Sequence, residues 1–364
     1  MPPDSPRSDL LGLEPDLLQQ ELERFFAARG KPPFRARQVV RWIFEGDAQG
    51  VDDMTDLPLE ERKALAAAYE LREPEVDTVA RSSDGTAKHL WRLHDGELVE
   101  SVLIPAGDRL TLCISSQAGC AMGCTFCATG WGGFRRHLTA GEIVSQFRAS
   151  RRWAAEEGYG PITNLVYMGM GEPLANREAV MSSLTILNQG YRFGARRITV
   201  STVGVVPGIR ELARRPEQFR LALSLHAPDE ALRRELIPLE KRWPLPEVLD
   251  ALREFDAAGG KRITFEYTMI DGVNDDPSLA PRLATMARDL RAFVNLIPFN
   301  PIPYRDWGAS PPDRVAHFAR VLEERGVDVA VREPRGRDID AACGQLRAHA
   351  LVQVEGRRGA PGTT

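Results

Sequence analysis

The chain has 364 residues, of which 43% are hydrophobic, and its formal net charge is -4. This length allows one large domain and a smaller one. No run of residues approaches the roughly 18 apolar positions that a membrane span needs, so we expect no membrane association. The charge balance is not that of a typical nucleic-acid-binding chain, which is usually basic.

The cysteine content and the first residues both favour a cytoplasmic protein. Five cysteines, an odd number, argue against a disulfide framework. The opening stretch MPPDSPRSDLLGLEPD is acidic and rich in proline, and it lacks the apolar core of a signal peptide. We therefore expect reduced thiols in the cytoplasm.

The first part of the chain predicts a small helical domain. We expect disorder in residues 1–16, and again in residues 352–364 at the other end. Between residues 17 and 75, apolar residues recur at helical spacing in three segments, 17–30, 34–44 and 59–70.

Residues 76–108 have a different pattern, in which polar and apolar side chains alternate. The pairs Asp84-Gly85 and Asp95-Gly96 stand where hairpin turns would fall. We expect a short antiparallel β linker between two domains.

From residue 109 to 351 strands and amphipathic helices alternate, which predicts an α/β domain. Repeated β-α units imply a parallel sheet, closed or partly closed into a barrel with helices outside. The expected strands are 110–116, 164–170, 197–203, 220–226, 262–270, 293–299 and 327–333. Ligands bind at the carboxyl ends of the strands in such folds.

Three cysteines, Cys120, Cys124 and Cys127, stand on one short loop after the first of these strands. Three thiolates can hold three irons of a [4Fe-4S] cluster and leave the fourth iron open to a substrate. A zinc site, with His137 as the nearest fourth ligand, and a cluster-free reactive thiol loop are the alternatives.

Other polar or reactive residues also fall near strand ends. They are Gly171 and Glu172, Ser201, Ser224 with Leu225 and His226, Asn300, and Cys343. Each has a plain structural alternative, since serines and asparagines cap loops and a strand-end histidine can be structural. Any RNA contact needs local basic patches, for which the candidates are Arg135/Arg136, Arg192/Arg196/Arg197 and Arg332/Arg335/Arg337.

The cysteine loop, with Phe126 before the last cysteine, resembles the signature of the radical S-adenosylmethionine (SAM) superfamily. The Gly171-Glu172-Pro173 turn resembles that superfamily's site for the SAM amino group. Over nearly the whole chain the sequence resembles the bacterial RlmN/Cfr RNA adenosine methyltransferases. The motifs that carry this resemblance are PPFRARQVVRWIF, MTDLP, LVESVLIP, TLCISSQAGC, MGMGEPL, STVGVVP, LALSLHAP, FEYTMIDGVND, NLIPFNP and GRDIDAACGQL.

The resemblance implies a partial (β/α) radical SAM barrel with an RNA-contacting helical accessory domain. It implies that Cys120, Cys124 and Cys127 bind a [4Fe-4S] cluster. It further implies that Gly171, Glu172, Ser201, Ser224, Leu225, His226 and Asn300 bind SAM.

The resemblance also implies a reaction that uses two SAM molecules. Cys343 accepts a methyl group from the first, and a radical made from the second activates that methyl for addition to adenine. Cys113 then releases the protein–RNA adduct, and Glu100 is the expected proton acceptor or a neighbour of the reacting groups. Without the resemblance, Cys113 would be interpreted as a buried core cysteine.

The family's housekeeping members modify carbon 2 of adenosine in 23S rRNA and in tRNA, with an electron donor of the flavodoxin type. The accessory-domain motifs favour this interpretation. A Cfr-like enzyme that methylates carbon 8 would use the same cysteines and is the first alternative. The second alternative is a metal-bound RNA-binding or redox-sensing module without turnover, which would have no need of a SAM pocket.

Overall fold

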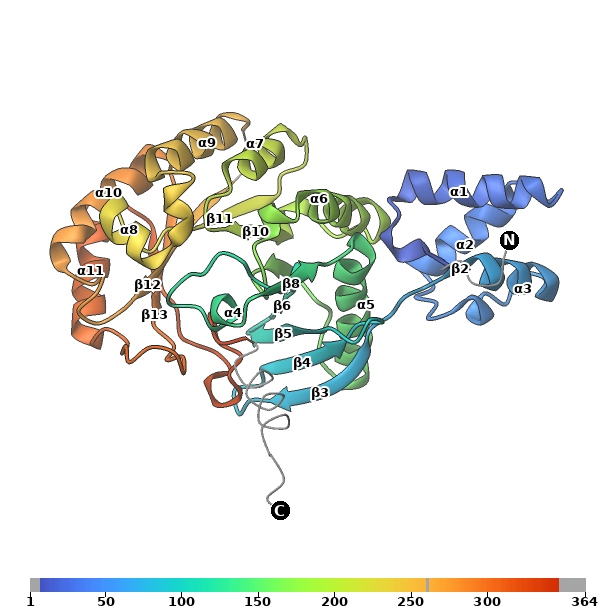
Figure 1. Cartoon of the computed structure of the whole chain (residues 1–364), viewed down its shortest axis with the longest axis horizontal. Helices are drawn as coiled ribbons and strands as arrows, with labels where there is room; N and C mark the ends of the chain where they lie inside the picture. Colours follow the sequence, from blue (N-terminus) through green and yellow to red (C-terminus); the bar gives the residue numbers. More distant parts are fainter. Residues whose placement is uncertain (1–6, 260–261, 347–364) are drawn as a thin grey trace, which may run out of the picture.

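The computed structural model describes residues 7–259 and 262–346. A helical unit from the N-terminal part of the chain lies beside a larger α/β unit (Figure 1). The predicted tail 352–364 and the last residues of the predicted catalytic domain, 347–351, lie outside the described residues.

The helical unit contains the three predicted helices. They are α1 (Pro15–Ala28), α2 (Phe34–Phe44) and α3 (Leu59–Ala68). Leu18, Leu22 and Phe26 follow one face of α1 and are completely buried against Val39 and Ile43 of α2. This i, i+4 spacing is the basis of the helical prediction, which is confirmed.

The prediction of disorder through residue 16 is wrong for residues 7–16. Strand β1 (Ser8–Asp9) pairs in parallel with β2 (Tyr69–Glu70), and Leu10 and Leu11 are buried in the core of the helical unit. The proline and acidic residues of the segment favour disorder, but the burial of Leu10 and Leu11 in the core of the helical unit outweighs this tendency.

The α/β unit is built on a single sheet. In the part of the chain that the structure describes, ten strands follow the order β14-β13-β12-β11-β10-β9-β6-β5-β4-β3. The strands from β6 through β9 to β14 are parallel, which confirms the predicted partial barrel. Their bounds are β6 (Arg109–Cys113), β9 (Asn164–Tyr167), β10 (Ile198–Thr202), β11 (Arg220–Ser224), β12 (Ile263–Met269), β13 (Phe293–Pro298) and β14 (Val329–Val331).

The expected β linker is not a separate sheet. Strands β3 (Glu75–Arg81), β4 (Ala87–Arg92) and β5 (Leu98–Ala106) form the predicted antiparallel hairpins, and β5 then pairs with β6. Gly85 and Gly96 have φ angles of +84° and +86° at the two turns. The three strands extend the barrel sheet because they cover an edge of β6 that would otherwise be unpaired.

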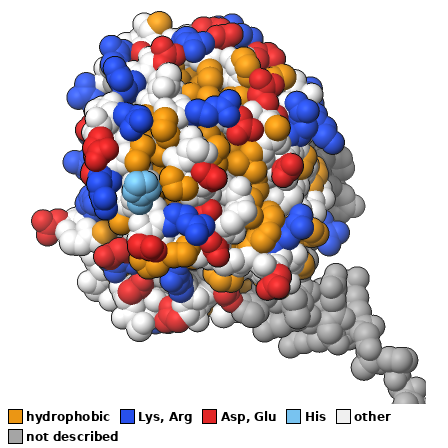
Figure 2. All heavy atoms as spheres, turned by 90° about the vertical axis from the view of Figure 1, so that its left-hand side faces the viewer, with side chains coloured by type: hydrophobic (Ala, Val, Ile, Leu, Met, Phe, Trp, Pro, Cys, Tyr) orange, Lys and Arg blue, Asp and Glu red, His pale blue; other side chains and the backbone are white. Residues whose placement is uncertain are grey.

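Helices pack on the outer side of the sheet (Figure 1). They are α5 (Ala140–Glu156), α6 (Arg177–Thr185), α7 (Val206–Arg214), α8 (Glu230–Leu236), α9 (Leu245–Ala257), α10 (Ala280–Asp289) and α11 (Pro312–Glu324). Figure 2 shows the side of the α/β unit that lies at the left of Figure 1, where basic and acidic side chains are interspersed. This face therefore offers no continuous basic surface to RNA.

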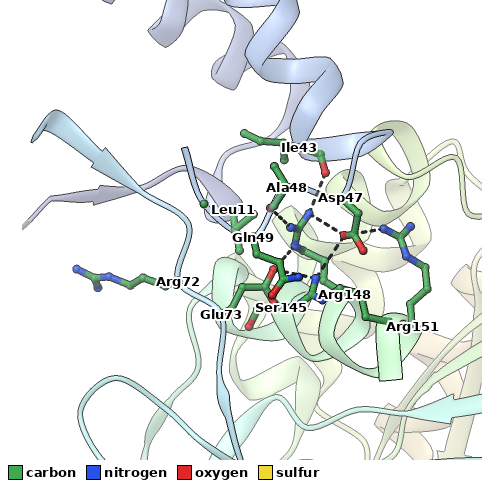
Figure 3. A network of polar contacts seen from close by, with 12 residues as sticks. Leu11, Ile43, Asp47, Ala48, Gln49, Arg72, Glu73, Ser145, Arg148 and Arg151 are labelled. Atoms are coloured by element: carbon green, nitrogen blue, oxygen red, sulfur yellow. Dashed lines mark hydrogen bonds and ion pairs between the residues drawn. The ribbon is translucent and has the colours of Figure 1, made fainter. Parts of the chain in front are cut away.

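A completely buried arginine joins the helical unit to the α/β unit (Figure 3). Arg148 of α5 donates hydrogen bonds to the carbonyl oxygens of Ile43 (2.8 Å) and Ala48 (2.6 Å) in the helical unit. It also pairs with the carboxylate of Glu73 (2.5 Å) and donates to the hydroxyl of Tyr191 (2.7 Å). One side chain thus ties the end of α2, the connection to β3 and the barrel's outer layer together.

Candidate active site

A cavity of about 960 Å³, partly open to solvent, lies at the carboxyl ends of the parallel strands. Ten of the predicted site residues line it: Cys120, Cys124, Cys127, Gly171, Glu172, Ser201, Ser224, His226, Asn300 and Cys343. The structure therefore brings these ten residues together around one cavity.

The three-cysteine loop lies between β7 (Gln117–Gly119) and the short helix α4 (Ala128–Trp131). Strand β8 (Phe134–His137) returns antiparallel to β7 and closes the loop into a compact unit. Burial raises the pKa of the Cys120 thiol to about 12. Such thiols need a bound cation to become thiolates, as a metal centre would supply.

The arrangement fits a cluster better than a single zinc ion. Within the described residues, no three His, Cys, Asp or Glu side chains converge on one ion position. Each cysteine of a cubane binds a different iron, so its ligands need not converge. The predicted fourth zinc ligand, His137, instead has its Nδ1 3.0 Å from the amide nitrogen of Gln117.

The Gly171-Glu172 turn is held in place by the loop beside it. Gly171 has a φ of +99°, and a Cβ there would lie 2.5 Å from the side chain of Gln117, so only glycine fits. Glu172 is buried, and its carboxylate accepts hydrogen bonds from the N–H groups of Leu174 (3.0 Å) and Val203 (2.9 Å). Burial raises the pKa of this carboxyl group to about 7. A positively charged ligand group would therefore gain from binding next to it.

His226 occupies the left-handed region with a φ of +56° at the end of β11. Its Nδ1 accepts a hydrogen bond from the backbone N–H of Thr268 (3.0 Å). Its ring lies 4.3 Å from that of Phe126 in the cysteine loop. Burial lowers the pKa of His226 to about 3, so the ring is neutral and acts as a fixed wall of the cavity.

Cys343 lies on the loop after β14. Its side chain is exposed to the cavity, where its surroundings are the protein atoms of the cavity wall. The side-chain amide of Asn300 donates to its carbonyl oxygen (3.2 Å). Burial raises the pKa of the Cys343 thiol, while the positive charge of the Arg332 guanidinium opposes the rise.

Two cavity residues near Cys343 were missed as site residues. Glu266 on β12 accepts a hydrogen bond from Asn295 (2.9 Å), and burial raises its pKa. Arg332 interacts with both Glu266 and Cys343, whereas the sequence placed it in a surface basic patch. Arg332 stands near the end of the predicted strand 327–333, whereas Glu266 lies in the middle of the predicted strand 262–270, where no signal in the sequence marks it.

Comparison with known proteins gives the same picture. Residues 114–279 match the family model of the radical SAM superfamily. Residues 9–71 match the model of the ribosomal RNA large subunit methyltransferase N-terminal domain. A probable dual-specificity RNA methyltransferase RlmN from Gemmatimonas aurantiaca is 50% identical over 94% of this chain and 94% of its own length. The corresponding protein of Anaeromyxobacter sp. strain Fw109-5 is 48% identical over 95% of this chain and 92% of its own length.

The chain belongs to the RlmN family of radical SAM methyltransferases. A solved radical SAM methyltransferase from Sphaerobacter thermophilus has a TM-score of 0.88 and 47% identity to it, over 94% of this chain and 99% of that one. The cofactors of this enzyme superfamily are a [4Fe-4S] cluster and SAM. The cysteine loop and the Glu172 turn fit these two groups.

Three predicted site residues of this RlmN family member lie behind the cavity wall rather than in it. Cys113 is buried on β6 in a small cluster with Met170 and Ala341, and burial raises its thiol pKa to about 12. Its charge interaction with Cys343 places the two cysteines near each other. Leu225 is buried in the main core, and Glu100 lies on β5.

The predicted basic patches are only partly available to RNA. Arg136 is held in ion pairs with Asp95 (2.6 Å) and Glu142 (2.8 Å). Arg337 donates to the side chain of Asn300 (3.2 Å). RNA contacts of this RlmN family member must therefore involve other side chains as well.

Proposed function

We propose that this enzyme methylates carbon 2 of adenosine in 23S rRNA and in tRNA beside the anticodon, with SAM as the methyl donor. One observation carries the proposal. Cys343 faces the cavity lined by the three-cysteine loop, and Cys113 lies close behind it. The chain thus has one thiol to carry a methyl group and a second to release the product.

Carbon 2 of adenine lies between two ring nitrogens and is electron-poor. The methyl group of SAM is itself an electrophile, so direct transfer to that carbon is unfavourable. A carbon radical can add there without a nucleophile, which explains the need for an Fe–S cluster.

Cys120, Cys124 and Cys127 would hold the cluster, and Gly171, Glu172, Ser201, Ser224, Leu225, His226 and Asn300 would bind SAM. The bound cluster supplies the electron that cleaves SAM to a 5′-deoxyadenosyl radical. Leu225 can contribute only through its backbone or through packing, because its side chain is buried in the core. Glu172 would face the SAM amino group.

Cys343 would take the first methyl group as a thiolate, with sulfur displacing S-adenosylhomocysteine. Arg332 lines the same cavity, and its positive charge would favour that thiolate. The radical adduct would first lose the proton on carbon 2 and one electron, to an acceptor such as the oxidised cluster. The Cys113 thiolate would then attack the Cys343 sulfur, the bond from that sulfur to the added carbon would break, and that carbon would take up a proton to become the methyl group. This leaves a Cys113–Cys343 disulfide, which a reductant must reopen before the next turnover. Glu100 is proposed to handle a proton or to support these groups.

Carbon 2 is preferred to carbon 8 because residues 9–71 match the RlmN-type N-terminal domain. The relatives named above carry the description of dual-specificity RNA methyltransferases. A Cfr-like enzyme acting on carbon 8 is the second candidate, because the same two cysteines would serve it.

An electron donor of the flavodoxin type and a cytoplasmic location complete the proposal. Among the described residues, no helix has both the length and the apolar character to cross a membrane. The donor must be a partner, because neither SAM nor RNA can reduce the cluster.

The test is an anaerobic assay with reconstituted protein, a chemical reductant, methyl-labelled SAM and a 23S rRNA fragment or tRNA. The digested nucleosides are resolved by mass spectrometry against 2-methyladenosine and 8-methyladenosine. We expect 2-methyladenosine. An 8-methyladenosine peak would assign the protein to the second candidate, and cluster-loaded protein that binds RNA without methylating it would point to a non-catalytic module.

A further inference from the structure

Four side chains, two exposed and two half-buried, form a group beside the cavity but do not line it. Trp131 ends α4, directly after the cysteine loop. Tyr304, Arg305 and Trp307 lie on the loop that follows β13. We call these four residues the rim platform. In Figure 1, α4 lies near the centre of the view, between β5 and β13.

The rim platform is an ordered stack. The rings of Trp131 and Tyr304 are 5.4 Å apart and nearly parallel, with an interplanar angle of 13°. The guanidinium of Arg305 lies 5.4 Å from the Trp131 ring and 4.9 Å from the Trp307 ring. The Trp131 indole N–H donates to the carbonyl of Thr125 (3.3 Å), which fixes its orientation.

The platform remains open to solvent in spite of this order. Trp131 is 47% exposed, and Arg305 is also exposed. No ion pair with a carboxylate of the described residues holds Arg305, so its charge rests against aromatic rings. Tyr304 and Trp307 are half-buried and pack against the cluster of buried residues around Phe299, so the exposed part of the group is the Trp131 ring and the Arg305 guanidinium.

The position of the platform connects it to the cavity. Cys127 and Thr129 line the cavity from the segment that leads to Trp131, and Phe299 and Asn300 line it from the segment that leads to Tyr304. The platform therefore lies next to two of the segments that form the cavity wall.

We propose that the rim platform binds an unpaired RNA base next to the target adenosine. The inference rests on the proposed function, because that function puts an adenine in the cavity. A target base inside folded RNA must leave its stack before it can enter a pocket. Its neighbour then loses a stacking partner, and aromatic and guanidinium planes replace such partners in proteins that bind single-stranded RNA.

An RNA base suits the platform better than a protein partner does. The chain has a net charge of -4, so phosphate contacts depend on local cations such as Arg305. Flat rings beside a free guanidinium match the π-face of a base and its adjoining phosphate at the same time. The electron donor is the other macromolecule that must approach the enzyme, and the experiment distinguishes it.

The experiment measures anaerobic binding of a short fluorescent RNA hairpin that carries the adenosine modified by the wild-type enzyme. Two further hairpins lack the base on the 5′ or the 3′ side of that adenosine. We expect Trp131→Ala to bind the intact hairpin about tenfold more weakly. The wild-type protein should bind one of the two abasic hairpins about tenfold more weakly than the intact hairpin. Trp131→Ala should bind that abasic hairpin no more weakly than the wild type does. Trp131→Phe should keep most of the affinity.

Arg305→Gln gives an independent test from the other loop. It should weaken binding of the intact hairpin and reduce its dependence on salt. Arg81→Ala is the matched control, because it removes a guanidinium 5.0 Å from the ring of Trp153 on α5, away from the platform. Iron content and reductive SAM cleavage without RNA separate damage to the cluster loop from loss of an RNA contact.

The outcomes separate the platform from the proposed function. Wild-type protein that neither binds nor methylates any RNA would contradict the proposed function, and the platform with it. Wild-type binding with unchanged affinity in both variants would overturn the platform alone. The platform proposal would also be overturned if Trp131→Ala and a missing neighbouring base weakened RNA binding additively. It would be overturned as well by variants that bind RNA normally but accept electrons poorly from a flavodoxin-type donor.

Discussion

The ammonium nitrogen of Lys88 lies 3.2 Å from Oε1 of Glu100, and both side chains are almost fully buried. Lys88 also donates a hydrogen bond to the carbonyl oxygen of Asp340 (3.1 Å), three residues before Cys343. The pair thus connects the antiparallel strands β4 and β5 to the loop that carries Cys343, the proposed methyl acceptor. Glu100, the expected proton acceptor, does not line the cavity.

If Glu100 acts by positioning the Cys343 loop through Lys88, Lys88→Met should impair methyl transfer to Cys343 as strongly as Glu100→Gln does. Lys88→Met should also destabilise the fold by about 3 kcal/mol, because it removes a positive charge from beside a buried carboxylate. The double variant should recover part of that stability. Urea unfolding and single-turnover methylation of Cys343 provide the measurements. Loss of product with a normally methylated Cys343 in Glu100→Gln alone would instead favour a direct proton transfer.

Cys343→Ala should abolish RNA methylation and leave reductive cleavage of SAM. The side chain faces the cavity but is not part of the three-cysteine loop, so its removal should not affect cluster binding. The measurement is the yield of 5′-deoxyadenosine with dithionite, beside mass spectrometry of the digested RNA. Cys124→Ala is the control that should lose both. Full turnover by Cys343→Ala would remove this cysteine from the mechanism.

Cys113→Ala should accumulate protein that is covalently attached to RNA. Cys113 is buried within reach of the Cys343 charge, which suits a thiol that acts after the base has become attached to Cys343. A denaturing gel with labelled RNA shows the adduct directly. The double variant Cys113→Ala/Cys343→Ala should show none. Free methylated RNA from Cys113→Ala at the wild-type rate would mean that another group resolves the adduct.

The parts of the site that could be predicted from the sequence are those that local sequence patterns mark. Strand ends and cysteine spacing are local features, and they are enough to place Cys120, Glu172 and Cys343 in one region of the molecule. Arg332 could not be assigned in this way. Its contacts with Glu266 and Cys343 depend on how the last loop folds back over the cavity.

The position of β3–β5 in the main sheet was missed for a similar reason. An alternating pattern predicts hairpins, but it does not say which edge they join. That depends on β6, whose second neighbour is β9 rather than another hairpin strand. The role of Arg148 was missed as well. In the sequence it is one of several polar residues in a helical segment, and its partner Ile43 lies far away along the chain.

Arg148→Met should destabilise the protein by about 3–5 kcal/mol, because it removes the Arg148 donor from two buried carbonyl groups and from Glu73, whose carboxylate keeps, among the described residues, only its pair with Arg152 (2.8 Å). Arg151→Met is the matched control on the same helix. Its partly exposed pair with Asp47 (2.8 Å) should contribute less than about 1 kcal/mol. Urea unfolding measures both. Equal effects of the two substitutions would show that the buried contacts do not hold the helical unit in place.

His89→Phe should stabilise the protein, and more so at low pH. The imidazole lies between Trp91 (4.8 Å) and Trp153 (4.4 Å), and neither ring nitrogen has a hydrogen-bond partner among the described residues. Burial lowers the pKa of His89 from 6.5 to about 4, so the unfolded chain binds a proton that the folded chain rejects. Stability is therefore fully present above about pH 6.5 and is lost as the pH falls toward 4.

His89→Phe removes this proton linkage and also the cost of two unpaired buried nitrogens. At pH 8 the gain should be about 1 kcal/mol, and at pH 5 it should be larger by about 2 kcal/mol. Urea unfolding of both proteins at the two pH values gives the difference directly. A gain that does not change with pH would mean that the buried ring takes up its proton as easily as an exposed one, and that the tryptophans do not exclude water from it.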